Sequence, residues 1–249
     1  MSDTTPTIAL FGFGAFGQLL ARLLAPDLPL MACDPAPGAA EAAARLAVPL
    51  VAEAEALQAD ILILAVPVGA MAGLLVRIAP QLRPGQLVVD VASVKEEPAR
   101  LMQALLPEGV EALATHPMFG PASSRAGVEG AQVVLCPLRG RGWRRLAAFL
   151  RARHGLRLIL ATPEEHDAQA ALSQGMTHLI GHALRSLGPA PRIRTRSFEM
   201  MMEALAMVAG DAPEVYEAVT RGNRHVAPLR DRLVAALAEG GMGDPLAGK

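Results

Sequence analysis

Two side chains in the first half of the chain are of types that can handle a hydroxyl group and its proton. His116 opens the segment His-Pro-Met-Phe-Gly-Pro after a short apolar run, and Ser93 lies in the segment Asp-Val-Ala-Ser-Val-Lys. An imidazole is the usual proton acceptor near neutral pH. Loss of a hydride from a carbon that bears a hydroxyl group needs such an acceptor, because the hydroxyl gives up its proton as the carbonyl forms. The two residues therefore indicate alcohol oxidation, provided that a hydride acceptor lies nearby.

A glycine-rich turn near the N-terminus offers a site for that acceptor. Gly12, Gly14 and Gly17 follow an apolar run and precede a segment with a helical pattern, which is the context of a dinucleotide-binding turn. The first glycine permits the tight turn, the second lets the backbone approach a pyrophosphate, and the third lets helix and strand pack closely. We expect these glycines, with Ala15 and Phe16, to bind the pyrophosphate at a helix N-terminus. The alternative is a turn that binds nothing.

An acidic residue after the second apolar run supports the dinucleotide interpretation. Asp34 ends this run, where a carboxylate can bind the hydroxyls of the adenosine ribose. Because a 2′-phosphate would meet a like charge, NAD is the expected cofactor, and NADP is left open. Val66 and Pro67, after the third apolar run, are expected to lie along the cofactor, although an ordinary strand-to-loop turn explains them equally well.

Ser93 and His116 each have a structural explanation as well. Ser93, with Glu96 three residues later, fits a capping box at the start of a helix. A single histidine at a strand end is more often structural than catalytic. The glycine- and proline-rich loop 119–130 follows His116, at the edge where ligands bind in open α/β sheets. This position favours the catalytic interpretation.

Short, continuously apolar runs alternate with helical segments over the first 161 residues. Such runs are typical of strands in a sheet that is covered on both faces. Their alternation with helices predicts an α/β fold with a Rossmann-like, doubly wound parallel sheet. The expected strands are 7–11, 30–33, 61–66, 87–90, 111–114, 132–135 and 156–160, with helices over 18–24, 39–46 and 71–78. We assign residues 1–161 to this dinucleotide-binding domain.

From Thr162 onward the pattern is helical and no strand-like run is left. Thr162, followed by Pro163 and by Glu165 three residues on, predicts a helix start. Helices are expected over about 163–187, 196–209 and 213–239, and the glycine-rich end 240–249 is expected to fray. We assign residues 162–249 to an all-helical domain.

The composition argues against several other classes of function. The chain has 249 residues, of which 52% are hydrophobic and 19% charged, with a net charge of −1. Neither a nucleic-acid partner nor a charged tail is indicated. No apolar run is long enough to span a membrane, and the first residues lack the pattern of a secretion signal, so we expect a cytoplasmic protein. Cys33 and Cys136 do not have the spacing of a metal site, and no metal is expected.

Together, these segments resemble the prephenate and arogenate dehydrogenases of tyrosine biosynthesis. The resemblance rests on the glycine-rich turn, the Ser-Val-Lys and His-Pro-Met-x-Gly-Pro segments, the sequence Glu165-His166-Asp167 and the helical second half, and it covers residues 7–237. It implies an NAD(P)-dependent oxidative decarboxylation: the ring alcohol of prephenate or arogenate gives its hydride to the nicotinamide, and the ring carboxylate leaves as CO₂. His116 would then be catalytic and hold the ring hydroxyl, and Ser93 would hydrogen-bond the same hydroxyl and orient His116. The product would be 4-hydroxyphenylpyruvate or tyrosine.

The resemblance also implies substrate-binding residues in the helical half. Gln174 and His178 are four residues apart, on one helix face, and are expected at the substrate. The alternative is a polar stripe at a subunit or domain contact. The substrate carboxylates call for a cation, preferably an arginine, and the nearest match is Arg196, in a segment that departs from the family pattern after this residue. Its rivals are Arg192, Arg194 and Arg221.

The family further implies a homodimer that forms through the helical domain. An apolar helix face is in line with this expectation, although burial within the small helical domain would explain it too. This face contains Met200, Met201, Leu205, Met207 and Val208.

Two other functions fit parts of the pattern. A β-hydroxyacid dehydrogenase or imine reductase also has a Rossmann domain followed by helices. Such an enzyme is expected to have its catalytic lysine or aspartate in the first interdomain helix, where this chain has His166, Asp167, Gln174 and His178. A non-catalytic NAD(H)-sensing protein would bind the cofactor without turnover, and the presence of Ser93 and His116 argues against it.

Overall fold

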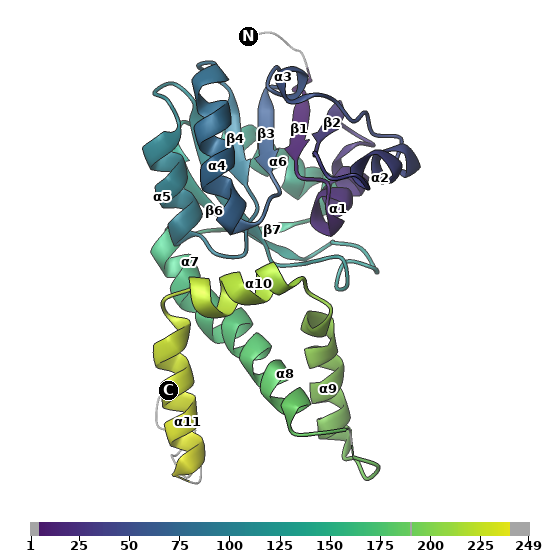
Figure 1. Ribbon diagram of the computed structural model, residues 1–249, viewed down its shortest axis with the longest axis vertical. Helices are drawn as coiled ribbons and strands as arrows, with labels where there is room; N and C mark the ends of the chain where they lie inside the picture. Colours follow the sequence, from purple (N-terminus) through teal and green to yellow (C-terminus); the bar gives the residue numbers. More distant parts are fainter. Residues whose placement is uncertain (1–4, 190, 240–249) are drawn as a thin grey trace. The chain divides into compact units, whose positions relative to one another are not determined.

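The computed structural model describes residues 5–189 and 191–239, so the glycine-rich end from Gly240 lies outside the described residues. The chain forms two compact units, one up to His166 and one from Asp167 (Figure 1). None of the helices in the described ranges is long and apolar enough to cross a membrane.

The first unit is built around a single sheet, in which seven strands of the described residues lie in the order β2-β1-β3-β4-β5-β6-β7. The strands are β1 (Ile8–Phe11), β2 (Leu30–Cys33), β3 (Ile61–Leu64), β4 (Leu87–Asp90), β5 (Glu111–Pro117), β6 (Gln132–Arg139) and β7 (Arg157–Leu160). Neighbouring strands are parallel except β5 and β6, which are antiparallel. The predicted doubly wound α/β class is confirmed. The antiparallel pair was not predicted, because a buried strand has the same apolar pattern in either direction.

Side chains of strands β1 to β4 alternate between two hydrophobic cores, one on each face of the sheet. In β1, Ile8 and Leu10 belong to one core, and Ala9 and Phe11 belong to the other. The first core is shared with α1 (Ala15–Leu24), α2 (Ala39–Arg45) and α6 (Trp143–His154). The second is shared with α3 (Glu53–Ala56), α4 (Val68–Ile78) and α5 (Glu96–Leu105). Burial on both faces is the reason that the strands are continuously apolar in sequence.

The sheet has a switch point at β1, because β2 lies on one side of it and β3 lies on the other. In open α/β sheets, ligands bind at such a point, outside the carboxyl ends of the strands. The strand ends are level here, since Phe11 is in register with Cys33 and Leu64, and Leu64 is in register with Asp90. The segments that follow these four residues therefore meet along one edge of the sheet.

The second unit is helical. Its elements are the end of α7 (Pro163–Ala170), a π-helical turn (Ala171–Gly175), α8 (Met176–Ser186), α9 (Arg196–Ala209), α10 (Pro213–Glu217), a second π-helical turn (Ala218–Gly222) and α11 (Val226–Ala238). The predicted capping box is present, because the backbone N–H groups of Thr162 and Glu165 each donate to the other's side chain at 2.8 and 3.1 Å. The third predicted helix is divided at Asn223, whose backbone is extended and whose Nδ2 donates to the Asp167 carbonyl oxygen at 2.7 Å.

Candidate active site

Two of the three glycines in the turn after β1 are required by close packing. Gly12 has φ +98°, in the region that favours glycine, and a Cβ there would collide with the Ala65 carbonyl oxygen. A Cβ on Gly17 would collide with the Gly12 carbonyl oxygen. Gly14 is different, because nothing lies within 4 Å of the place its Cβ would occupy. The backbone at Gly14 therefore faces open space, which a pyrophosphate needs in order to approach it.

The N-terminus of α1 provides partial positive charge beside the open space at Gly14. Gly14 is the N-cap residue and no side chain caps the helix. The first backbone N–H groups of a helix have no acceptor within it, and together with the helix dipole they attract an anion. Here those groups belong to Ala15, Phe16 and Gly17. The turn thus fits the pyrophosphate of a dinucleotide.

Asp34 and Val66 lie on either side of this turn. The Asp34 carboxylate accepts the Phe13 N–H at 2.6 Å and the Ala36 N–H at 2.8 Å. Each carboxylate oxygen can accept further hydrogen bonds, so the ribose hydroxyls of a dinucleotide could still bind there. Val66 packs close to the turn, because a Cβ on Gly12 would lie 3.2 Å from its Cγ1. Pro67, which follows Val66, is the N-cap residue of α4. The structure therefore brings the predicted cofactor residues together.

His116 is the penultimate residue of β5 and is buried. The strand extends beyond its predicted end at Ala114, because β6 pairs with it as far as Pro117. Nδ1 of His116 lies 2.8 Å from Nε2 of His166. Burial lowers the pKa of His116 well below its ordinary value of 6.5, and repulsion by positive charge on His166, when that ring is protonated, and on Lys95 lowers it further. The ring is therefore neutral near pH 7, and one of its nitrogens can accept a proton.

Ser93 lies half-buried in the loop between β4 and α5. The capping alternative is wrong, because α5 begins at Glu96 with Lys95 as its N-cap residue and without a side-chain cap. Over the described part of the chain, the Ser93 hydroxyl has no hydrogen-bond partner. It is thus available to a ligand at the edge of the sheet where Asp90 ends β4.

A buried ion pair joins the Ser93 loop to the His116 strand. Nζ of Lys95 lies 2.5 and 2.7 Å from the carboxylate oxygens of Asp90, and it donates to the Thr115 carbonyl oxygen at 2.6 Å. The Thr115 hydroxyl in turn donates to the Asp90 carbonyl oxygen at 2.6 Å. Neither charged side chain has exposed surface. The network therefore ties the loop that contains Ser93 to Thr115, the residue that precedes His116.

Sequence reasoning missed the contributions of Lys95 and His166. Lys95 belongs to one of the motifs that carry the resemblance, but a lysine is rarely buried without a partner, and its partner Asp90 was not recognised. His166 belongs to the Glu165-His166-Asp167 segment of the resemblance, and no role at the site was predicted for it. The sequence signal for both residues was their position in segments that carry the resemblance to the prephenate and arogenate dehydrogenases.

Within the helical unit, the predicted residues Gln174 and His178 lie together. Nδ1 of His178 is 3.0 Å from the Gln174 carbonyl oxygen, and Nε2 is 3.1 Å from the carboxylate of Asp211. The side-chain Oε1 of Gln174 is buried and has no partner among the described residues. Arg196 lies on another helix, at the exposed start of α9, 3.7 and 3.9 Å from two glutamates of the same helix.

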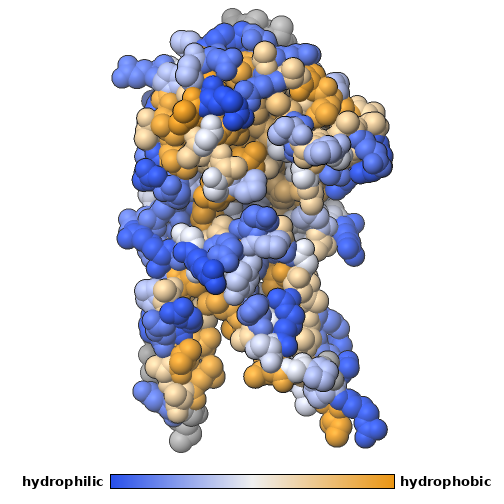
Figure 2. Space-filling model, viewed as in Figure 1, coloured by the Kyte–Doolittle hydropathy of each residue, from blue (hydrophilic) through white to orange (hydrophobic). Residues whose placement is uncertain are grey.

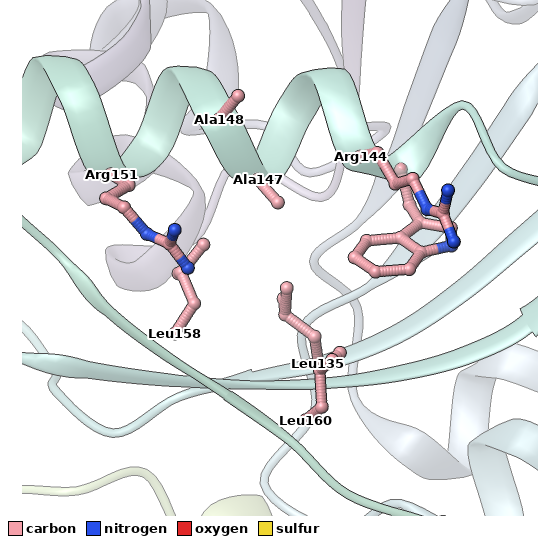
Figure 3. Close-up of a pocket in the computed structure, with 8 residues that line it drawn as sticks. Leu135, Arg144, Ala147, Ala148, Arg151, Leu158 and Leu160 are labelled. Atoms are coloured by element: carbon pink, nitrogen blue, oxygen red, sulfur yellow. The ribbon is translucent and has the colours of Figure 1, made fainter.

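A shallow groove lies elsewhere in the first unit, between α6 and strands β6 and β7 (Figure 3). None of the predicted site residues lines it. Its lining consists of Leu135, Trp143, Arg144, Ala147, Ala148, Arg151, Leu158 and Leu160. The groove is therefore separate from the candidate active site.

Comparison with known proteins shows which family this chain resembles. The family model described as prephenate dehydrogenase, nucleotide-binding domain, matches residues 22–156, more than half of the chain. A probable arogenate/prephenate dehydrogenase of Methanocaldococcus jannaschii is 28% identical over 187 residues, which cover 70% of this chain and 41% of that protein. Arogenate dehydrogenase 1, chloroplastic, of Arabidopsis thaliana is 31% identical over 220 residues, which cover 84% of this chain and 34% of that protein.

The fold is shared with solved structures. A prephenate dehydrogenase from A. aeolicus, in complex with hydroxyphenyl propionate and NAD+, has a TM-score of 0.76 at 18% identity, and the match covers 96% of this chain and 90% of that chain. The chain spans less than half the length of the two curated relatives described above. The match of the family model over more than half of the sequence shows that this chain belongs to the prephenate dehydrogenase family.

Proposed function

We propose that this protein is an NAD-dependent dehydrogenase that oxidatively decarboxylates prephenate, arogenate or both. The observation that carries the proposal is a buried, neutral His116 at the same end of the sheet as a glycine turn that fits a dinucleotide. The names of the relatives from M. jannaschii and A. thaliana, and the NAD+ in the A. aeolicus structure, support the same substrate class and cofactor.

The proposed roles of the site residues follow from the chemistry of the substrate. NAD, when bound, supplies the hydride acceptor. His116 accepts the proton of the ring hydroxyl as the hydride leaves the carbon that bears this hydroxyl, and Ser93 hydrogen-bonds the hydroxyl oxygen. The carbon–carboxylate bond then breaks, its electron pair completes the aromatic ring, and CO₂ leaves. The phenolic oxygen takes the proton back from His116, so the reaction has no net proton release and the imidazole is neutral again.

Cofactor preference is assigned to Asp34. Its carboxylate lies against the glycine turn, where Phe13 donates to it. The 2′-phosphate of NADP would place a second negative charge at this carboxylate, so we assign NAD as the preferred cofactor.

Substrate binding is assigned in part to the helical half. The division between the two functional domains is placed near residue 162. The buried, unpartnered Oε1 of Gln174 supports a ligand there, because a buried polar atom without a hydrogen bond is costly. His178 is proposed beside it, and Arg196 is proposed to bind a substrate carboxylate as a bidentate donor.

The helical unit is also proposed to form a homodimer with a second copy of this chain. Several of its large apolar side chains are exposed, for example Met200 at 57% and Leu172 at 65%. Apolar side chains are visible on these helices in Figure 2. Analytical ultracentrifugation should therefore detect a dimer, and the double substitution Met200→Glu and Met207→Glu should shift it towards the monomer.

The function is tested by initial rates with prephenate and with arogenate, each with NAD and with NADP. Formation of reduced nicotinamide together with release of CO₂ from either substrate supports the proposal. Binding of NAD without turnover of either substrate would instead favour a sensing protein. Turnover of a β-hydroxyacid alone would favour the other class of dehydrogenase.

A further inference from the structure

The proposed reaction assigns no role to the contact between His116 and His166. Both imidazoles are buried, each with 4% of its surface exposed. His166 lies in the first turn of α7, where its backbone N–H donates to the Thr162 carbonyl oxygen at 2.9 Å. Thr162 belongs to the capping box that starts this helix. The backbone of His166 is thus held at the start of α7 by local hydrogen bonds.

The hydrogen bond between the two rings links the positions of their protons. Nδ1 of His116 and Nε2 of His166 are 2.8 Å apart, so one nitrogen donates and the other accepts. A neutral imidazole has one N–H donor and one acceptor nitrogen. If Nδ1 of His116 donates, its Nε2 is an acceptor. If Nδ1 accepts, Nε2 carries the proton and cannot take another from a hydroxyl group.

We propose that His166 is a positioning residue that holds His116 in the tautomer with its proton on Nδ1, so that Nε2 is presented to the substrate hydroxyl. This inference rests on the proposed function of His116 as the proton acceptor. The isolated side chain favours the opposite tautomer, so a specific acceptor is needed to fix this one. His166 provides the acceptor with Nε2 and carries its own proton on Nδ1.

The same contact stabilises His116 during the reaction. When Nε2 takes the hydroxyl proton, the bond from Nδ1–H to His166 becomes charge-assisted and stronger. Positive charge on His166 itself, or on Lys95, disfavours the protonated ring, so this stabilisation requires that His166 stay neutral and accept through Nε2. His166 therefore stabilises the protonated ring from one side, and the proton returns to the phenolic oxygen once CO₂ has left.

The tautomer can be measured directly on the NAD complex by NMR of protein labelled with ¹⁵N-histidine. The chain has six histidines, so single variants can assign the signals. We expect His116 to carry its proton on Nδ1 in the wild type. His166→Leu removes the acceptor, and we expect His116 to shift to the other tautomer and kcat to fall by about 10²–10⁴-fold, the usual contribution of a general base.

A conservative variant separates positioning from a merely structural role. His166→Gln keeps an oxygen acceptor at similar reach, so we expect the wild-type tautomer and a kcat within about tenfold of the wild type. Affinity for NAD should be unchanged in both variants. The matched control is His182→Gln, at an exposed position of α8, which should change neither the kcat nor the tautomer of His116.

Two results would overturn the inference. One is a wild-type His116 with its proton on Nε2. The other is a His166→Leu variant that keeps the wild-type tautomer and kcat. If neither prephenate nor arogenate is turned over by the wild type, the proposed function fails, and the tautomer in the NAD complex still decides the role of His166. The wild-type spectrum also decides it if the leucine variant does not fold.

Discussion

The three glycines of the cofactor turn should respond differently to the same added methyl group. Gly14→Ala places a Cβ where nothing lies within 4 Å, so the free energy of unfolding should change by no more than about 1 kcal/mol. The methyl group would fill the space for the pyrophosphate and cost one charge-assisted hydrogen bond, or about 1.5–3 kcal/mol. The Kd for NAD should therefore rise by about 10- to 100-fold.

Gly17→Ala should instead reduce stability. Its Cβ would collide with the Gly12 carbonyl oxygen, and such overpacking costs about 1–3 kcal/mol. For a chain of this size, each 1 kcal/mol lowers the Tm by about 2–4 °C. Urea unfolding and calorimetric titration with NAD separate the two effects.

The control is Gly73→Ala, at an exposed position of α4 with open space around it. It should leave the Kd for NAD unchanged and stabilise the helix by up to about 1 kcal/mol. Wild-type NAD affinity in Gly14→Ala would refute the proposed path of the pyrophosphate. Wild-type stability in Gly17→Ala would refute the packing argument.

Three further predictions concern charges at the site. His116→Asn should abolish turnover and leave the Kd for NAD nearly intact. In the wild type, kcat/KM should fall only below pH 6.5 on the acid side, because the lowered pKa of His116 keeps its ring neutral down to that pH. A fall that begins above pH 6.5 would contradict this. Asp34→Ser should raise kcat/KM for NADP relative to NAD, and an unchanged ratio would count against the ribose contact. Lys95→Met leaves the Asp90 carboxylate buried without its cation, so urea unfolding should show that the free energy of unfolding falls by about 3–5 kcal/mol. Adding Asp90→Asn to this variant should recover part of the loss. Equal losses in the single and the double variant would argue against the ion pair.

Much of the fold could be predicted from the sequence, because both faces of the sheet are buried. Ile61 to Leu64 are all buried, and only an interior strand has such a run in this context. The cofactor edge followed from the positions of the strand ends. The residues Gly12 and Asp34 could be placed together for the same reason, since each directly follows its strand.

Contacts between distant segments could not be predicted. His116 and His166 are 50 residues apart, and no local pattern links a strand end to a helix start so far along the chain. The burial of Lys95 depends on Asp90 and on the Thr115 carbonyl oxygen of another strand. The π-helical turns were not predicted, because each helix was expected to keep one uniform period along its whole length.

The π-helical turn Ala171–Gly175 makes the helix that contains it sensitive to length. On its N-terminal side the Asp167 carbonyl oxygen accepts from Asn223, and on its C-terminal side His178 contacts Asp211. Removing one residue between them would rotate the two ends of the helix relative to each other by about 100°. Only one of these contacts could then be kept, so homologous chains that keep both should tolerate substitutions here far more readily than single-residue deletions.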